Sequence, residues 1–545
     1  MSPKLWPRWL STDAPAYSLV SSPTALAAAV GTLLVAVYLQ WSPLSPDLAA
    51  QFARTGVVHR AGNVSWWTGW FGGVSLPDYS VLAPASMAAF GIRACGVAAA
   101  LAGAVAMSIL VRDALRPRAG AVAFAVAGFA DLVDGRVTFV IGLAIAAWAL
   151  VALRSHWNLA AVVLAVGAYL ASPLAGLFLG LVFLAVIVVD RSRRLGATVG
   201  AGCLLAPGTG MAVLFPGTGV MPFGFTDAIP PAVGCVVVAL LCPSRLVKAS
   251  ALLALLALPA FLIVPGAIGG NIGRFAWVAA APVIIACCPM SWRRVAGFVV
   301  LLAAWPASDL VEQLTAAAAP SAGRAFYLPL ATELTTERHQ AGTAALGQRV
   351  EVVDTVNHWA STYLSNTDAV ARGWDRQADV ADNPIFYLHG ALTPATYRSW
   401  LDQLAVGWVA VPTARLDYAS VREGQLINNG LDYLHLTWSS PHWRLYRVQH
   451  STPLATGAAV VAVTTSNVTL AMAAPGAAWV RVRWSAYLTV LDPLTLQPVP
   501  ACITNVAGWT RLDMPHAGTF ALTSRFNLTA RFHRTQTGCT TTTRN

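Results

Sequence analysis

The chain has 545 residues, of which 56% are hydrophobic and 11% are charged, with a mean hydropathy of +0.60. Soluble domains carry about 25% charged residues, so this composition excludes an ordinary cytosolic enzyme, a disordered tail and a small disulfide scaffold. The formal net charge of +11 is unevenly spread, because residues 1–310 hold 18 Lys and Arg against 9 Asp and the first Glu is Glu312. We attribute this excess to membrane topology rather than to a nucleic-acid partner.

Long apolar segments predict eleven transmembrane helices in the first 310 residues. A helix needs roughly 20 apolar residues to cross a hydrocarbon core of about 30 Å. The first segment is interpreted as a span rather than a cleaved signal peptide, because the chain stays hydrophobic far beyond it and no small-residue cleavage site follows. In chain order, we expect the spans at 25–40, 94–111, 119–133, 136–153, 158–171, 173–190, 195–215, 231–243, 249–264, 276–289 and 295–309.

Basic residues lie at alternate ends of successive spans, which indicates the orientation in the membrane. In short loops, an excess of Lys and Arg marks the cytoplasmic side. An odd number of spans then predicts a multi-pass plasma-membrane protein with a cytoplasmic N-terminus, and with everything after about residue 310 on the extracytoplasmic side. The basic loops are at 4–8, 112–118, 154, 191–194, 245–248 and 293–294.

The rest of the chain is expected to form two extracytoplasmic domains. Residues 311–450 predict an α/β domain, with a buried strand at 407–412, short strands or turns at 383–387 and 443–448, and a helix at 393–404. Residues 451–545 predict a β-sandwich that would serve as a carbohydrate-binding module, from short β-type runs at 458–464, 468–473, 479–484, 487–490, 518–523 and 526–532. Cys502 and Cys539 predict a disulfide, because they are the only external pair.

A long outer loop at 40–93 carries the first candidate site. A carboxylate at the membrane boundary, such as Asp47, can accept a proton from a hydroxyl group, and aromatic faces stack on sugar rings. The alternative is that the tryptophans form an interfacial belt and that Asp47 caps a helix. The further candidates in this loop for orienting donor or acceptor are Trp66, Trp67, Trp70, Asp78 and Tyr79.

Two other outer loops hold ionisable groups near membrane depth, where an ionisable residue is by default a hypothesis for a functional site. Asp131 and Asp134 lie in one turn and would orient hydroxyl groups, unless Asp134 pairs with Arg136 and caps the next helix. The glycine-rich loop at 266–275 contains Asn271 and Arg274, which would bind a phosphate through backbone N–H groups and a guanidinium. The alternative for Arg274 is a side chain that snorkels from a flexible turn.

A polar segment in the external part is typical of carbohydrate recognition. Residues 371–379 contain two Arg, two Asp, one Gln and one Trp, and a His-Trp pair precedes them at 358–359. A salt-bridged structural turn would explain this composition equally well. The acceptor-binding candidates are His358, Arg372, Trp374 and Arg376.

Together, these features resemble the GT-C type of integral-membrane glycosyltransferase. The resemblance rests on about eleven spans, an elaborated first outer loop with an acid near its start, and a globular external C-terminal part. More narrowly, segments 72–84, 269–274 and 371–377 resemble actinobacterial membrane proteins of this kind. The Ala-, Val- and Arg-rich, Lys-poor composition fits a high-GC actinobacterium.

The resemblance implies a polyprenyl-phosphate sugar donor, with arabinofuranose or mannose as the sugar, and a cell-envelope glycan as the acceptor. Asp47 would be the general base of an inverting single displacement, with Asn271 and Arg274 on the donor phosphate. Many members carry two adjacent acids where this chain has Asp47 followed by Leu48, so a divalent metal ion is not favoured but stays open. A transporter or flippase for envelope lipids or glycans, and a non-catalytic envelope scaffold, are the alternatives from other classes.

Overall fold

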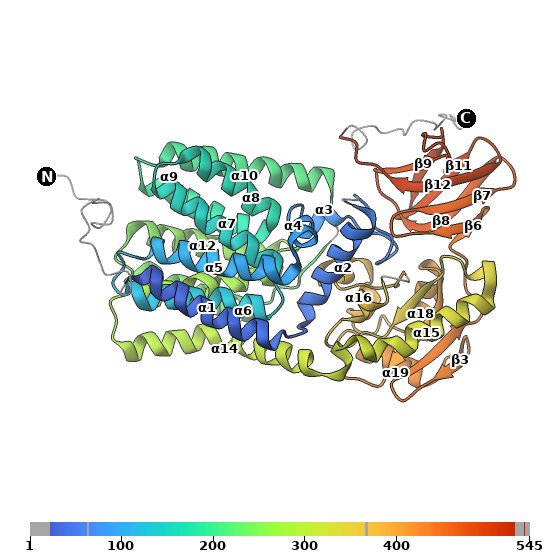
Figure 1. Cartoon of the computed structure of the whole chain (residues 1–545), viewed down its shortest axis with the longest axis horizontal. Coiled ribbons are helices and arrows are strands. Elements are labelled where there is room, and N and C mark those ends of the chain that lie inside the picture. The colour runs from blue at the N-terminus through green and yellow to red at the C-terminus, as the bar shows by residue number, and fades with distance from the viewer. Residues whose placement is uncertain (1–21, 63–64, 218, 366–368, 529–538, 540–545) are drawn as a thin grey trace. The chain divides into compact units, whose positions relative to one another are not determined.

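The computed structural model contains two compact units. Unit 1 extends to Gln51 and resumes from Asp78 to Ala318, whereas unit 2 combines Phe52–Pro77 with the chain from Ala319 onward. Within them, the structure describes residues 22–62, 65–217, 219–365, 369–528 and 539 (Figure 1). The division after the helical part therefore lies at 318, close to the predicted 310, but the middle of the predicted first outer loop belongs to unit 2.

Unit 1 is helical, and each of the eleven predicted spans coincides with helical structure (Figure 1). Three shorter helices, α2 (Pro46–Ala61), α3 (Leu76–Tyr79) and α4 (Ala83–Phe90), follow the first of these. The others, in chain order, are α1 (Pro23–Trp41), α5 (Ile92–Leu110), α6 (Pro117–Val133), α7 (Val137–Arg154), α8 (Asn158–Ala171), α9 (Pro173–Val189), α10 (Arg194–Leu214), α11 (Phe225–Leu241), α12 (Arg245–Ile263), η2 (Gly269–Gly273), η3 (Ala276–Ala280), α13 (Ala281–Cys287) and α14 (Trp292–Ala318).

Several of these helices have the length and composition of membrane spans. Among the described residues, six are long and apolar enough to cross a membrane, or seven if the two halves of α14, bent by 46°, count as one span. The apolar helices α8, α9 and α11 are shorter. The chain is thus a multi-pass membrane protein by length and composition, and the total of eleven spans stays a prediction.

Small residues let the helices of unit 1 pack closely, as is common in membrane proteins. Helix α7 packs against α5, α8 and α9. A Cβ atom added at Gly142 of α7 would lie 2.6 Å from the Cβ atom of Ser172. The hydroxyl group of Ser172 in turn caps α9 by accepting a hydrogen bond from the backbone N–H of Ala175.

The first part of unit 2 is an α/β arrangement around a four-stranded sheet of order β1-β2-β4-β3. Strand β2 is parallel to β1 and antiparallel to β4. The predicted strand at 407–412 is β2, which is buried along its whole length, whereas 383–387 forms a turn, η6 (Pro384–Phe386). The elements are α15 (Arg324–Ala341), β1 (Arg349–Val352), α16 (Ala360–Tyr363), α17 (Arg376–Asp382), α18 (Pro394–Gln403), β2 (Val406–Pro412), α19 (Val421–Asn428), β3 (Leu434–Ser439) and β4 (Trp443–Val448).

The second part of unit 2 consists of two four-stranded sheets, β10-β11-β8-β5 and β6-β7-β12-β9, that share one apolar core. Cys502 of β10 forms a disulfide with Cys539. The predicted run at 526–532 contains no strand up to residue 528, and its remainder lies outside the described residues. The strands are β5 (Ala455–Thr456), β6 (Ala459–Val463), β7 (Val468–Met472), β8 (Gly476–Arg483), β9 (Leu488–Leu491), β10 (Cys502–Val506), β11 (Trp509–Met514) and β12 (Gly518–Ser524).

Candidate active site

Four aspartates surround one arginine in unit 1. The guanidinium group of Arg136 lies 3.1 Å from the carboxylate of Asp47, 3.4 Å from that of Asp131, 2.7 Å from that of Asp134 and 2.6 Å from that of Asp309. We call these five residues the Arg136 cluster. The ion pair between Asp134 and Arg136 that the sequence offered as an alternative is present. Arg136 also forms ion pairs with the other three carboxylates.

A tight turn between α6 and α7 brings the cluster together. Asp131 lies in the last turn of α6, Asp134 follows this helix, and Arg136 immediately precedes α7. Gly135 has a φ of +83°, and a Cβ atom there would lie 2.4 Å from the backbone nitrogen of Leu48. Only glycine therefore lets this turn approach the first turn of α2, where Asp47 lies.

The four carboxylates differ in their access to solvent. The side chains of Asp131 and Asp134 are 0% and 6% exposed, whereas those of Asp47 and Asp309 each keep 26%. A buried carboxylate is tolerated only with a compensating charge or hydrogen bonds, so Arg136 is the counter-ion that makes this burial feasible. The two partly exposed carboxylates are the ones that a substrate can reach.

Asp309 is the cluster residue that sequence reasoning missed as a site. It lies on α14, and its contact with Arg136 spans a sequence separation of 173 residues. The one local signal is a lone acid at the outer end of a predicted apolar span, which is the same signal that marked Asp47.

Arg274 lies near the same cluster but is not neutralised by an ion pair. It follows η2, and its guanidinium group lies over the ring of Phe139 at 5.3 Å. Asp131, Asp47 and Tyr79 are within electrostatic range of it. Across the described part of the chain, the Arg274 side chain forms neither a hydrogen bond nor an ion pair, so its donors are available to an anion.

An apolar groove of about 480 Å³ is lined on α6 by residues from Arg118 to Ala127, and the buried Asp131 lies one helical turn beyond this lining. On α6, Ala119, Ala123 and Ala127 line the groove at successive turns, and Asp131 continues the same i, i+4 row. The side chain of Trp277, which also lines the groove, lies beside Asp131. One end of the groove is therefore next to the Arg136 cluster.

The predicted donor-binding and orienting residues of unit 1 have different surroundings. Asn271 is partly buried within η2, one turn before Arg274. Asp78 is exposed, whereas Tyr79 is partly buried and close to Arg274. No group of three or more His, Cys, Asp or Glu residues is arranged to hold a metal ion in the part of the chain that the structure describes.

The tryptophans of the predicted first outer loop are packing residues of unit 2. Trp67 and Trp70 are each 1% exposed, and their ring centroids are 4.6 Å apart. The indole N–H of Trp70 donates a hydrogen bond to the backbone carbonyl of Ser361. Trp66 packs against the apolar core of the two C-terminal sheets. Trp67 and Trp70 therefore present no open stacking surface for a sugar, whereas Trp66 is only partly buried, and the orienting role of the three residues stays a prediction.

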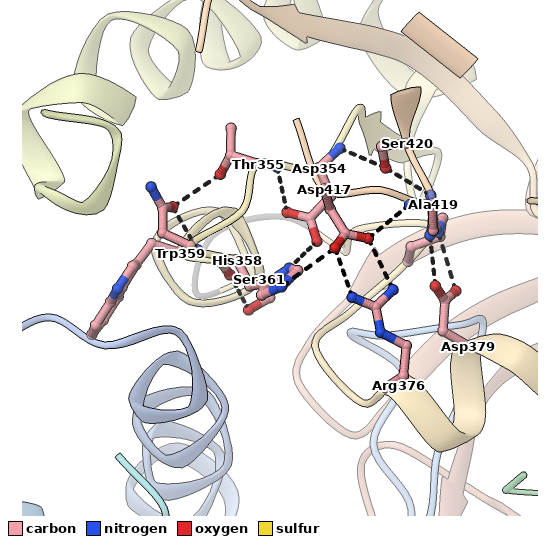
Figure 2. Close-up of polar contacts among 12 residues, drawn as sticks. Asp354, Thr355, His358, Trp359, Ser361, Arg376, Asp379, Asp417, Ala419 and Ser420 are labelled. Carbon is pink, nitrogen blue, oxygen red and sulfur yellow. Dashed lines mark hydrogen bonds and ion pairs between the residues drawn. The ribbon is translucent and has the colours of Figure 1, made fainter. Parts of the chain in front are cut away.

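A second polar cluster in unit 2 brings together three of the four predicted acceptor-binding residues. Figure 2 shows His358 directed at two carboxylates, with its Nδ1 atom 2.5 Å from Asp354 and its Nε2 atom 4.0 Å from Asp417. Arg376 donates two hydrogen bonds to Asp417, at 2.9 and 2.8 Å. The ring of Trp374 stacks on that of His358 at 3.4 Å. We call these five residues the His358 cluster.

The electrostatics of the His358 cluster hold its parts in place. Burial alone would raise the pKa of Asp417, but His358 and Arg376 outweigh burial and hold that pKa at about 2. His358 adopts a φ of +57°, a strained conformation for a residue other than glycine. His358 is only 4% exposed, so its contribution is to hold Asp354 and Trp374 in place. The accessible surface beside the cluster is aromatic, because Tyr418 is 66% exposed and its ring lies 4.6 Å from the guanidinium carbon of Arg376.

Arg372 belongs to a different, buried network. It is 8% exposed, and it donates hydrogen bonds to Asp379 at 2.6 and 3.1 Å and to Glu423 at 3.4 Å. Burial raises the pKa of Glu423 to about 7, because Arg372 offsets only part of the desolvation. For Arg372, the alternative of a salt-bridged structural element fits the geometry, and a direct contact with an acceptor does not.

Comparisons with known proteins give one similarity. No protein-family model matches the chain, and no curated protein matches it. Among solved structures, the chain is similar to a cryo-EM structure of a mutant of arabinofuranosyltransferase AftD from mycobacteria, with a TM-score of 0.46 and 14% identity, over 94% of this chain and 60% of that one. The chain thus spans about 60% of the length of that protein. A likeness at this level carries no argument about activity, so the functional argument rests on the side chains of unit 1.

Proposed function

We propose that the protein is a membrane glycosyltransferase that moves a sugar from a polyprenyl-phosphate donor to a cell-envelope glycan. The observation that carries this proposal is a conjunction within unit 1. A partly exposed carboxylate, Asp47, and a guanidinium group without an ion-pair partner, Arg274, lie in one electrostatic neighbourhood, next to the end of an apolar groove. These groups suit the three needs of the reaction: a base, a phosphate-binding cation and a place for a prenyl chain.

The donor would lie with its prenyl chain in the groove and its phosphate at Arg274. The groove is almost wholly apolar along α6 and opposite it along η3, α13 and α14, so a hydrocarbon chain is its natural occupant. Trp277 would lie where the chain meets the phosphate. A phosphate group near aspartates is repelled unless their negative charges are neutralised. The ion pairs of Asp131 and Asp134 with Arg136 would therefore favour binding of the donor phosphate as well as the fold.

The chemistry we propose is a single displacement at the anomeric carbon. Asp47 accepts the proton of an acceptor hydroxyl group, and the hydroxyl oxygen forms the new bond to the anomeric carbon. The bond between this carbon and the phosphate oxygen breaks, and its electron pair leaves with the polyprenyl phosphate. Arg274 stabilises the charge that develops on that phosphate. The anomeric configuration is inverted, because attack and departure occur on opposite faces.

The basic loops of unit 1 support an orientation with the N-terminus in the cytoplasm and unit 2 on the extracytoplasmic side. Cell-envelope glycans are found on that side, and unit 2 would hold the acceptor. At the His358 cluster, a sugar would contact Trp374 and Arg376 together with the adjacent Tyr418, whose ring lies against Arg376. His358 would act there as a positioning residue through its contacts with Asp354 and Trp374.

The test is transfer of radiolabelled arabinofuranose or mannose from its polyprenyl phosphate to envelope glycan by the full chain in nanodiscs. Loss of a general base lowers rates by about 10²–10⁴, so Asp47→Asn should fall in that range. Loss of one charge-stabilising donor costs about 10²–10³, which is the range expected for Arg274→Ala. The matched controls are Asp227→Asn and Arg294→Ala, which change exposed residues of unit 1 outside the cluster.

Asp309 is the rival for the role of base, because it has the same exposed fraction as Asp47. If Asp309→Asn abolishes transfer and Asp47→Asn does not, the base assignment moves to Asp309. Wild-type turnover in both Asp47→Asn and Arg274→Ala would refute the proposal. Substrate flux across the membrane without sugar transfer would favour a transporter, and neither flux nor transfer would favour a scaffold.

A further inference from the structure

We propose that unit 2 contains a separate binding pocket for a neutral oligosaccharide, between helix α18 and the outer face of the sheet β10-β11-β8-β5. The pocket has a volume of about 500 Å³, which is within the range of about 300–1,000 Å³ for small-molecule sites. None of its lining residues belongs to the His358 cluster or to the Arg136 cluster. The proposal of this pocket requires only that the chain bind a sugar, and it therefore does not depend on the transfer reaction proposed above.

One wall of the pocket is the polar face of α18. Arg398, Ser399, Asp402 and Gln403 follow the i, i+4 spacing that places them on one side of the helix. Ser399 and Gln403 are exposed, and the amide of Gln403 donates a hydrogen bond to the hydroxyl group of Ser399 at 3.4 Å. An amide and a hydroxyl group each keep further donors and acceptors, so this wall offers several hydrogen-bonding positions to sugar hydroxyl groups.

The opposite wall is aromatic. Along β8, residues alternate between the sandwich core and the outer face of the sheet, so that Trp479 and Arg481 lie on the outer face. Trp479 is partly exposed, whereas Trp509 on the neighbouring strand β11 is 9% exposed and packs in the apolar core of the α/β part. Both residues line the pocket, and Trp479 supplies the accessible ring. A flat aromatic ring beside polar side chains suits the apolar face and hydroxyl edges of a sugar ring better than it suits an extended peptide.

The charged groups of the pocket are already used within the protein. Arg398 pairs with Asp402 at 2.9 and 3.2 Å, and both Arg398 and Arg481 donate hydrogen bonds to backbone carbonyl groups of residues 449–453. Arg481 also donates to the backbone carbonyl of Asp402 at 3.1 Å. These bonds tie α18 to β8, which gives a preformed pocket. Because its guanidinium groups are occupied, the pocket favours a neutral sugar over a phosphate or a carboxylate.

The experiment measures binding to the full chain in nanodiscs by surface plasmon resonance, without any donor lipid. The probes are linear arabino-oligosaccharides and manno-oligosaccharides, both neutral. We expect saturable binding of at least one of them, about tenfold weaker in Trp479→Ala and a few-fold weaker in Gln403→Ala. Trp438→Ala and Gln497→Ala, which lie outside the pocket, should bind as the wild type does.

Two further variants distinguish a loss of sugar binding at this pocket from a loss of folding and from a loss of the transfer reaction. Trp479→Phe keeps an aromatic ring and should retain most of the affinity if Trp479→Ala proves unstable. Asp47→Asn should bind the probes like the wild type, so that a failed transfer assay leaves this inference standing and a failed binding assay leaves the transferase proposal standing. Absence of binding to both probes, or equal affinity in wild type and Gln403→Ala, would overturn the pocket.

Discussion

Replacing Arg136 with methionine tests whether one guanidinium group holds four carboxylates in place. Methionine keeps much of the aliphatic length, so the substitution removes the charge more than the packing. The charge is paired at 2.6–3.4 Å with four aspartates, of which Asp131 is fully buried and Asp134 nearly so. Removal of one partner from a buried ion pair costs about 3–5 kcal/mol, because the other charge is left uncompensated, and we expect Arg136→Met to lose at least this much stability.

The assay is unfolding of the full chain in detergent micelles, followed by intrinsic fluorescence, with Arg294→Met as the control at an exposed arginine of the same unit. Adding Asp134→Asn to Arg136→Met should recover part of the loss, because it removes one uncompensated carboxylate. In the wild-type background, the same Asp134→Asn change should destabilise. If Arg136→Met stays within about 1 kcal/mol of the wild type, or if the two changes are simply additive, the counter-ion role of Arg136 is wrong.

Three further predictions concern unit 2. Burial raises the pKa of Glu423 and that of its neighbour Glu351 above their ordinary value of 4.5. The stability that protonation of this pair provides is complete below pH 4.5 and is lost as the pH rises through the raised values. Glu423→Gln removes one of the two carboxyl groups and should therefore reduce the slope of thermal stability against pH above 4.5, and an unchanged slope would contradict this. Trp70→Ala should destabilise unit 2 by about 3–5 kcal/mol, seen as faster limited proteolysis, whereas wild-type resistance would show that the ring is not core. Reduction of the Cys502–Cys539 disulfide, which links residues 37 apart, should cost about 2–4 kcal/mol in denaturant unfolding, and Cys502→Ser should be insensitive to reductant.

The helices of unit 1 were predictable because each span is a long apolar segment with charged or turn-forming residues at its ends. Hydropathy contains less information about the predicted first outer loop at 40–93. Helix α2 is polar in composition, and the chain from Phe52 to Pro77 packs in unit 2. Its tryptophans resemble an interfacial belt in sequence, since a buried and an interfacial tryptophan give the same local signal. Only distant partners, such as the Ser361 carbonyl that accepts from Trp70, tell the two apart.

The candidate site was predictable in part. Asp47 stood out as a lone acid near the membrane boundary, Asp131 and Asp134 as two acids in one outer turn, and Arg274 as an isolated cation among apolar residues. Their convergence depends on the turn at Gly135 and on tertiary packing, for which one sequence contains no signal. The same limit hid Asp309, whose partner is 173 residues away.

In unit 2, the strength of the local pattern decided which strands were predicted. Strand β2 is a continuous apolar run, which is typical of a strand buried on both faces. Strands β10 and β11 were missed, because polar side chains such as Asn505, Arg511 and Asp513 alternate with their buried residues and make the apolar pattern short. Their pairing with each other and with β8 is set by contacts across the sheet.

The most direct measurement is a cryo-EM structure of the full chain in nanodiscs with a non-hydrolysable polyprenyl-phosphonate sugar bound. We predict that the prenyl chain follows the groove along Ala119, Ala123 and Ala127, that the phosphonate accepts hydrogen bonds from Arg274, and that the anomeric carbon faces Asp47. A phosphonate bound away from Arg274, or a sugar that neither Asp47 nor Asp309 can reach, would contradict the transferase mechanism and leave only the membrane fold.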